Sequence, residues 1–285
     1  MSSVTSPAAQ SATPFDYIRS LVLSDAGIVL ESGKEYLVES RLTPVAKREG
    51  LPSIAELVSA VRTRGGDLRR KVVEAMTTNE TTFYRDGEPF EFLEKHVLPK
   101  LIDARRARRQ LRIWYAAAST GQEPYSVSML IREQFPELLG WQLTQLGTDY
   151  SRPALDRARK GRYSQVEINR GLPAKLLVKY FAKQGLEWEI HESVRAMVKY
   201  DELNLNAPWP ALGQFDIIFI RNVMIYFDLE SKKRILNNIH KLLPADGYLF
   251  LGAAETTFNL DERFVRCDAG RAGCYQKAPA GAGAK

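Results

Sequence analysis

Cysteine and histidine are scarce in this sequence, which holds two cysteines and three histidines in 285 residues. Cys267 and Cys274 have a spacing that fits no zinc or redox motif, so we expect neither a metal centre nor a disulfide framework. No apolar run approaches the roughly 20 residues that cross a bilayer. The first residues also lack a basic start followed by an apolar segment, so we expect a cytoplasmic protein without a secretory signal or membrane insertion.

Positive charge exceeds negative charge and is concentrated in two places. The formal net charge is +6, which admits an acidic partner such as nucleic acid, an anionic membrane surface or an acidic protein segment. Residues 41–71 hold eight basic residues against three acidic ones, and five arginines lie within residues 105–112. The first cluster is either a solvated helix face or a docking surface. The second is better explained as a helix end that enters a sheet.

The first third of the chain has a helical pattern. Residues 1–13 lack apolar periodicity and predict a disordered leader. Residues 14–76 carry apolar side chains at helical spacing and predict a small all-helical domain. Ser53 begins a capping box, and Asp67 is a candidate cap of a further helix.

The pattern of the remaining chain predicts an α/β domain at residues 101–277, after a linker or lid at residues 77–100 and before a disordered tail at residues 278–285. Short apolar runs alternate with helical segments, which implies a mainly parallel sheet with helices on both faces. These runs are residues 111–117, 143–148, 215–221 and 248–252. Residues 186–191 and 194–199 predict a small hairpin inserted at about 183–200, and residues 264–276 predict a final antiparallel hairpin.

Distinctive residues follow the predicted strands at their carboxyl ends, where open α/β sheets bind ligands. The first strand leads into small residues at 117–121, with Pro124 placed as the first residue of a helix. This loop matches neither dinucleotide nor P-loop motifs, so such ligands are not indicated. Asp149 either accepts hydrogen bonds from a ribose or caps the next helix. Arg221 and Asn222 end a buried run, where polar groups need a ligand or a polar network.

The segment at residues 77–86 does not suit a core helix. It holds four threonines, an asparagine and an arginine beside two aromatic residues. It is either a capped interdomain linker or a lid that faces a ligand. The second interpretation is favoured because the segment joins the helical domain to the sheet domain.

At these segments the sequence resembles the chemotaxis receptor methyltransferases of the CheR family. Residues 77–86, 117–126, 147–149 and 221–227 match that family's signatures in its order and at its spacing. The resemblance covers about residues 15–277. It implies a small N-terminal all-helical domain, followed by a Rossmann-like class I methyltransferase domain with an inserted antiparallel β-subdomain.

The resemblance also implies a site for S-adenosyl-L-methionine, with S-adenosyl-L-homocysteine as the product. Asn79, Thr81 and Arg85 would close over this cofactor. Glu123 would hydrogen-bond to it at the end of the first strand. Asp149 would hold its ribose.

Four further residues complete the site that the resemblance implies. Asn204 and Leu205 would flank the adenine. Asn222 and Val223 would line the cofactor near the methyl group that is transferred. No metal ligand is implied.

The implied reaction is methyl transfer to glutamate carboxylates of chemotaxis receptors, which forms methyl esters. A free glutamate has a pKa of about 4.3 and is ionised at neutral pH, so neither a general base nor a metal is required. Arg85 is the candidate for steadying the acceptor carboxylate. Tyr226 either donates a hydrogen bond from the opposite side or is a packed aromatic residue.

The implied partner is the cytoplasmic signalling domain of a methyl-accepting chemotaxis receptor, whose acceptor helices carry glutamates. The first basic cluster then predicts a docking face that includes Arg62 and Arg69. Family members that bind a receptor's C-terminal pentapeptide have a longer, Gly-rich turn than residues 183–186 offer, so we expect no such tether. No exposed apolar patch stands out, so we expect a monomer.

Two other functions compete with this interpretation. A nucleic-acid methyltransferase would suit the positive charge, but enzymes that methylate amino groups of bases usually place Asn/Asp-Pro-Pro-Tyr/Phe where this chain has Arg221 to Met224. A non-catalytic module that senses S-adenosylmethionine or another nucleotide is the second. The intact set of matched residues argues against it.

Overall fold

The structure is a computed structural model that describes residues 13–279. Residues 1–12 and 280–285, which hold most of the predicted leader and tail, lie outside the described residues. The chain separates into two compact units between Thr77 and Thr78. Within the described residues, no helix combines the length and the hydrophobicity that crossing a bilayer requires.

Helices fill the first unit, as the apolar periodicity predicted. Within residues 13–77 they are α1 Pro14–Ala26, α2 Glu35–Arg48, α3 Ile54–Arg64 and α4 Gly66–Met76. The Ser53 hydroxyl accepts a hydrogen bond from the Glu56 N–H and caps α3, which is one half of the predicted capping box. The predicted cap at Asp67 is wrong. The cap is Gly65, two residues earlier, and Asp67 lies in the first turn of α4, where a negative charge suits the helix dipole.

A seven-stranded sheet forms the centre of the second unit within its described residues, 78–279, and confirms the predicted α/β fold. Five strands run parallel: β1 Gln110–Tyr115, β2 Gln142–Asp149, β6 Val198–Glu202, β7 Ile217–Ile220 and β8 Tyr248–Leu251. The antiparallel strands β9 Phe264–Arg266 and β10 Cys274–Lys277 form the predicted final hairpin. The strand order is β6-β2-β1-β7-β8-β10-β9. It reverses between β1 and β7, which is where open α/β sheets bind ligands.

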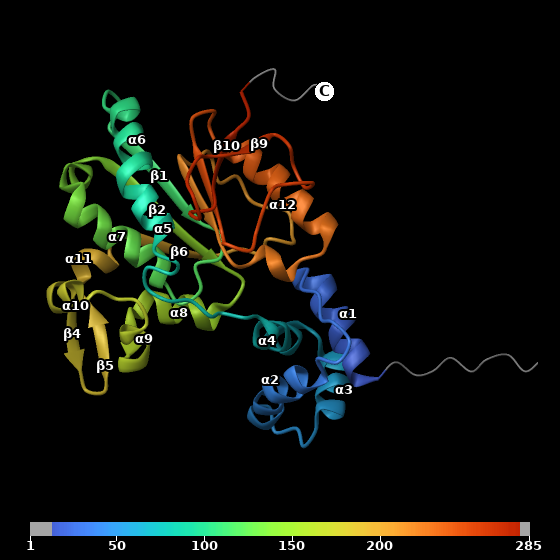
Figure 1. Ribbon diagram of the computed structural model, residues 1–285. Helices are drawn as coiled ribbons and strands as arrows, with labels where there is room; N and C mark the ends of the chain where they lie inside the picture. Colours follow the sequence, from blue (N-terminus) through green and yellow to red (C-terminus); the bar gives the residue numbers. More distant parts are fainter. Residues whose placement is uncertain (1–12, 280–285) are drawn as a thin grey trace, which may run out of the picture. The chain divides into compact units, whose positions relative to one another are not determined.

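Helices cover both faces of this sheet, and Figure 1 shows α7 and α12 on opposite sides of it. Odd-numbered residues of β1, such as Ile113, pack toward one face, and even-numbered residues, such as Trp114, pack toward the other. The first face is covered mainly by α5, a π-helical turn, α6 and α7, and the second by α12. Their bounds are α5 Glu88–Phe92, π-turn Leu93–Val97, α6 Leu98–Arg105, α7 Gln122–Gln134 and α12 Leu229–Leu242; a 3-10 turn, Pro136–Gly140, follows α7.

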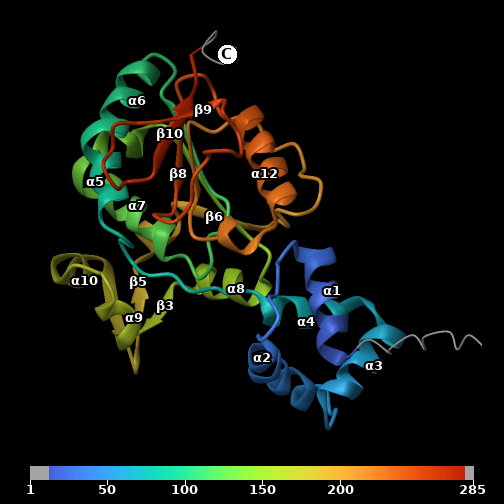
Figure 2. The ribbon, with the colours of Figure 1, turned by 45° about the vertical axis from the view of Figure 1, so that its right-hand side comes forward.

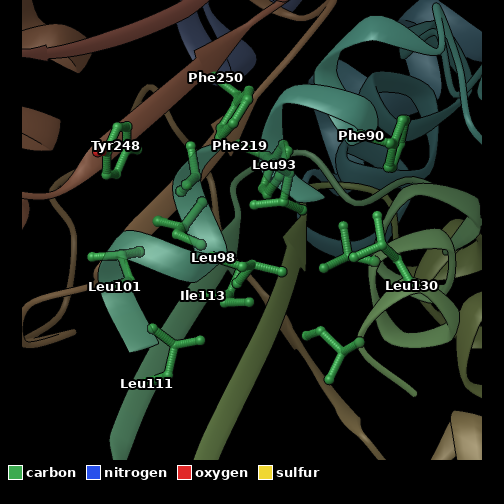
Figure 3. Packing of buried hydrophobic residues seen from close by; sticks show 14 of the residues in the cluster. Phe90, Leu93, Leu98, Leu101, Leu111, Ile113, Leu130, Phe219, Tyr248 and Phe250 are labelled. Carbon is green, nitrogen blue, oxygen red and sulfur yellow. The ribbon is translucent and has the colours of Figure 1, made fainter. Parts of the chain in front are cut away.

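Residues 88–100, which we assigned to a linker or lid, are instead part of the sheet domain. They are helical, and Leu93, Val97 and Leu98 are fully buried against the strands. Figure 3 shows side chains of this stretch packed over the sheet, among them Leu98 beside Ile113. Burial of this apolar stripe fixes the helical stretch on the sheet, so only residues 78–87 remain as a connecting segment.

The inserted subdomain is a three-stranded antiparallel sheet of order β3-β5-β4, seen with its helices in Figure 2. Its elements are β3 Arg162–Ser164, α9 Gln165–Asn169, α10 Ala174–Tyr180, β4 Phe181–Gln184 and β5 Glu187–Ile190. The predicted pairing of residues 186–191 with 194–199 is wrong, because β5 pairs with β4 and β3. Residues 192–195 form α11 Glu192–Arg195, and the chain then enters β6, which pairs with β2 of the large sheet.

The second basic cluster anchors the amino ends of the strands. Arg105 is buried, and its guanidinium forms ion pairs with Asp216, with 2.8 Å between Nε and Oδ1, and with Asp246. Arg108 also binds Asp216, at 2.8 Å. Arg112 donates to the carbonyl oxygens of Gln214 and Leu212. These arginines join a helix end to the sheet, as predicted, at the end opposite to the candidate site.

Candidate functional site

The loop after β1 brings backbone N–H groups to the carboxyl ends of the strands. Ser119 has φ 50° and Gly121 has φ 94°, and α7 begins directly afterwards at Gln122. A Cβ on Gly121 would lie 2.8 Å from the Tyr200 hydroxyl oxygen, so only glycine fits this close packing. Pro124 is therefore the third residue of the helix, and its prediction as the first is wrong. The N-terminus of α7 starts closer to the sheet than the proline suggested.

Asp149 ends β2 and is buried at the centre of a small polar network. Its Oδ2 accepts from Ser119 N–H at 2.9 Å, and its Oδ1 accepts from Ser151 N–H at 2.9 Å and from the Asn79 amide at 3.4 Å. Burial raises the pKa of Asp149, and hydrogen bonds from backbone N–H groups and from Asn79 oppose that shift. Helix α8 Arg152–Lys160 is capped by Ser151, so the alternative that Asp149 caps it is wrong. The carboxylate instead fixes the loop after β1 to the start of the segment after β2.

Residues 79–86, called the strap below, are held on the sheet domain by contacts along their whole length. The Asn79 carbonyl accepts from the Ser119 hydroxyl at 2.6 Å, and Tyr84 N–H donates to Ser126 Oγ at 3.0 Å. Phe83 is fully buried, with its ring packed edge-on against Tyr163. The strap therefore passes the carboxyl ends of β1 and β2 and is not a free linker.

Arg221, directly after β7, connects the strap to α7. Its guanidinium forms ion pairs with Glu123, with 2.6 Å between Nη1 and Oε2, and with Asp86, with 2.7 Å between Nη2 and Oδ2. It also donates to the Arg85 carbonyl at 2.9 Å. The Arg221 side chain is only 2% exposed and that of Glu123 12%. Burial raises the pKa of Glu123, and the charge and hydrogen bond of Arg221 oppose that shift.

Glu255 is a buried acidic residue that the sequence analysis missed. Its carboxylate accepts from the backbone N–H groups of Asn222 at 2.7 Å, Val223 at 3.0 Å and Ile225 at 3.3 Å. It also accepts from Gly252 N–H at 2.7 Å. Asp149 is the last residue of β2 and Glu255 lies in the turn after β8, so a search for an acid at or just after the end of a buried strand would have found both.

The remaining predicted cofactor residues lie at the same end of the sheet but differ in surroundings. Leu203 N–H donates to the Asp149 carbonyl at 3.0 Å, which brings the end of β6 beside β2. Asn204 is half-buried, and its side-chain oxygen accepts from Asn206 N–H. Leu205 is buried in the core on the α12 face. Thr81 is half-buried on the strap.

The two residues predicted to act on the acceptor come from different elements. Arg85 is half-buried on the strap and donates to the Glu80 carbonyl at 3.0 Å. Its charge reaches Glu123, where it helps to oppose the raised pKa that burial causes. Tyr226 is half-buried and ends a 3-10 turn, Met224–Tyr226, that follows β7. In the described part of the chain, no group of three or more His, Cys, Asp or Glu side chains is arranged to hold a metal ion.

The two residues predicted to dock a receptor lie in the helical unit, and each already contacts a neighbour there. Arg69 forms an ion pair with Asp25, with 2.5 Å between Nη2 and Oδ1. The Arg62 guanidinium lies over the Tyr17 ring, 4.5 Å from its centre. Within this unit the charge of Arg69 is therefore offset, whereas that of Arg62 is held against an aromatic face.

The ion pair of Arg221 gives a pH-dependent prediction. Removing Arg221 leaves Glu123 buried without its partner, so Arg221→Met should destabilise the sheet domain by about 3 kcal/mol near neutral pH. A carboxyl group whose folded pKa lies above its unfolded value of about 4.3 destabilises the fold progressively as pH rises between the two values. The deficit should therefore be smaller at about pH 5 than at about pH 8, as measured by urea unfolding.

The double variant Arg221→Met with Glu123→Gln is the matched control. Neither this variant nor Glu123→Gln alone has the group that titrates, so the deficit that Arg221→Met causes relative to Glu123→Gln should be the same at both pH values. An equal deficit at both pH values in the single variant would contradict the assignment.

Comparisons with known proteins agree with this architecture. A family model described as "CheR methyltransferase, all-alpha domain" matches residues 13–77, and one described as "CheR methyltransferase, SAM binding domain" matches residues 79–272. Chemotaxis protein methyltransferase 1 of Pseudomonas aeruginosa is 44% identical over 263 residues, which cover 90% of this chain and 95% of that protein. Chemotaxis protein methyltransferase Cher2 of Pseudomonas putida is 42% identical, with the same coverage. The chemotaxis protein methyltransferase of Escherichia coli is 33% identical and covers 88% of this chain and 87% of that protein. The chain therefore belongs to the CheR family of S-adenosylmethionine-dependent methyltransferases.

Proposed function

We propose that this methyltransferase esterifies glutamate side chains on the signalling domain of chemoreceptors, as a monomer in the cytoplasm. The observation that carries the acceptor class is the position of Arg85. Its partly exposed guanidinium lies on the strap, and Arg221 holds the Arg85 backbone at the end of β7. A cation at this point suits an anionic acceptor. A glutamate carboxylate, with a pKa of about 4.3, is already ionised at neutral pH and needs no base.

The residues at the carboxyl ends of the strands fit S-adenosylmethionine. Asp149 presents an acceptor-only group to the two hydroxyl donors of a ribose. Glu123 is an anion at the start of α7, which suits the cationic part of the cofactor. The small residues at 116–121 let the backbone approach a ligand closely. We propose that nine residues line the cofactor: Asn79, Thr81, Arg85, Glu123, Asp149, Asn204, Leu205, Asn222 and Val223. Leu205 would contribute only an apolar wall, because it is buried in the core.

The cofactor, when bound, supplies an electrophilic methyl group on a sulfonium. A glutamate oxygen forms the new C–O bond as the C–S bond breaks and its electron pair stays on sulfur, so no proton moves. The protein then has to orient the acceptor and exclude water, and alignment of reactants can contribute roughly 7–11 kcal/mol. Arg85 would steady the acceptor carboxylate, and Tyr226 would donate a hydrogen bond to it from the 3-10 turn after β7.

Methyl transfer from labelled cofactor to receptor-containing membranes tests the proposed acceptor. We expect label in the receptor that is released as methanol by mild base, because a methyl ester is base-labile and a methylated amine is not. The matched control is the same receptor with its acceptor glutamates replaced by alanine, which should take up no label. Label in nucleic acid, or binding of the cofactor without transfer to any acceptor, would contradict the proposal.

Arg85→Ala should lower methyl transfer by about 100-fold at saturating cofactor, the usual effect of removing one charge-stabilising donor. The Arg85 side chain donates one hydrogen bond, to the Glu80 carbonyl of the same strap. The variant should therefore unfold at nearly the same temperature as wild type. Arg170→Ala is the control, because the Arg170 side chain is 52% exposed and forms an ion pair with Glu80 of the same strap. Near-normal turnover of Arg85→Ala would remove this residue from the mechanism.

We also propose that Arg62 and Arg69 belong to a face that docks the acidic acceptor helices. Charge reversal at Arg62 should raise the KM for receptor, and should do so more than reversal at Arg69, because Asp25 already offsets Arg69. The affinity for S-adenosylhomocysteine should not change. Arg19→Glu is the control, because it makes the same change of charge at an exposed residue of α1, outside the basic cluster at residues 41–71. If charge reversal at Arg62 weakened S-adenosylhomocysteine binding by the same factor as it raised the KM for receptor, the cluster would have a structural role.

The β4–β5 turn supports independence from a receptor pentapeptide. Only two residues, Gly185 and Leu186, connect these strands, and Leu186 is 93% exposed. Calorimetry with a peptide that ends in a Trp- and Phe-bearing pentapeptide should detect no binding, while S-adenosylhomocysteine binds in the same preparation. Micromolar affinity for the peptide would contradict this proposal.

A further inference from the structure

Glu255 connects the turn after β8 to the turn after β7 through backbone N–H groups alone. Oε2 accepts from Gly252 and Asn222, both at 2.7 Å, and Oε1 accepts from Val223 at 3.0 Å and Ile225 at 3.3 Å. Glu255 is 8% exposed, so these bonds are shielded from water. Hydrogen bonds from N–H groups to a buried carboxylate are among the strong ones in proteins. The carboxylate therefore restrains four backbone N–H groups, three in the turn after β7 and one directly after β8.

The turn after β7 needs such a restraint. Asn222 has φ 57°, in the left-handed region that residues other than glycine rarely adopt. Val223 and Ile225 lie where the chain leaves the ladder and before the 3-10 turn Met224–Tyr226 is complete, so their N–H groups need an acceptor from elsewhere. Glu255 supplies that acceptor. The turn's own hydrogen bonds run from Tyr226 N–H to the Val223 carbonyl and from Phe227 N–H to the Met224 carbonyl, so they leave the N–H groups that Glu255 binds without a partner in the turn.

Gly252 provides the space for this contact. A Cβ on Gly252 would lie 2.7 Å from Glu255 Oε2, 2.7 Å from the side-chain nitrogen Nδ2 of Asn222 and 2.8 Å from the backbone nitrogen of Asn222. All three distances are too short for a side chain at this position. The absence of a side chain at Gly252 therefore lets the carboxylate reach Asn222.

We propose that Glu255 is a positioning residue for methyl transfer, which holds the backbone of Asn222 and Val223 at the place where they border the methyl donor. The inference rests on the proposed role of these two residues in lining the cofactor. Glu255 acts through them and contacts neither substrate. Displacement of reacting groups by about 1 Å can cost roughly 100-fold in rate, so the rate of transfer is the sensitive quantity.

Glu255→Gln tests the proposal with a side chain of nearly the same size. One carboxylate oxygen becomes an NH₂ group, which cannot accept from the two N–H groups that this oxygen held. We expect hydrogen exchange to accelerate at least about 10-fold at the amides of one pair, either Asn222 with Gly252 or Val223 with Ile225, as the loss of roughly one strong hydrogen bond implies. Affinity for S-adenosylhomocysteine should fall about 10-fold for the same reason. At saturating cofactor, kcat should fall further, by about 100-fold.

Glu262→Gln is the matched control, because Glu262 is an exposed acid in the same segment and its variant should leave all three quantities unchanged. Exchange and S-adenosylhomocysteine binding involve no methyl acceptor, so they test this inference even if the proposed glutamate acceptor is wrong. Glu255→Asp keeps the charge and should recover part of the exchange protection. Unchanged exchange at residues 222–225 in Glu255→Gln, or accelerated exchange throughout the sheet domain, would overturn the proposal. If Glu255→Gln does not fold, the comparison of Glu255→Asp with wild type decides by the same criteria.

Discussion

The guanidinium of Arg221 joins three parts of the sheet domain that are far apart in the sequence. It lies at the end of β7, binds Glu123 at the start of α7, and binds Asp86 and the Arg85 carbonyl on the strap. A charge that is 98% buried is tolerated only with such partners. The position of Arg85, on which the proposed acceptor chemistry depends, is thus set by a residue of the sheet and not by the strap alone.

Three carboxylates organise the rest of the site; two bind backbone N–H groups and one binds a guanidinium. Asp149 binds N–H groups of the loops after β1 and β2, Glu123 binds the guanidinium of Arg221, and Glu255 binds N–H groups of the turns after β7 and β8. Each carboxylate follows a strand or begins a helix at the carboxyl end of the sheet. Neighbouring loops are therefore fixed to one another, which gives a cofactor a preformed surface before it binds.

Periodicity was a good guide to strands and helices but a poor one to pairing. The apolar run before Arg221 predicted a buried strand, and the structure contains it as β7. Residues 194–199 also looked like a strand of a hairpin, whereas the structure forms a strand at residues 198–202 and places it as β6, the outer strand of the large sheet. Alternation indicates that a strand exists and which face is buried. It does not identify the neighbour.

Polar residues at the carboxyl ends of the strands were predictable where they ended an apolar run, as at Asp149 and Asn222, and much less so where their partners are backbone groups. Glu255 has four N–H partners and no side-chain motif to reveal them. Pro124 suggested a helix start that Gly121 moves closer to the sheet, because its positive φ starts the helix earlier. Such shifts depend on the local backbone conformation, which residue types constrain only weakly.

The central claim is that the strap is part of the cofactor site because Arg221 binds it there. A double-mutant cycle between Arg221→Met and Asp86→Ala, read out as the affinity for S-adenosylhomocysteine, tests this most directly. The account predicts that the two effects are not additive, with a coupling of about 1 kcal/mol or more between residues in direct contact. Additive effects within about 0.3 kcal/mol would show that the strap and the sheet contribute independently, and would contradict the account.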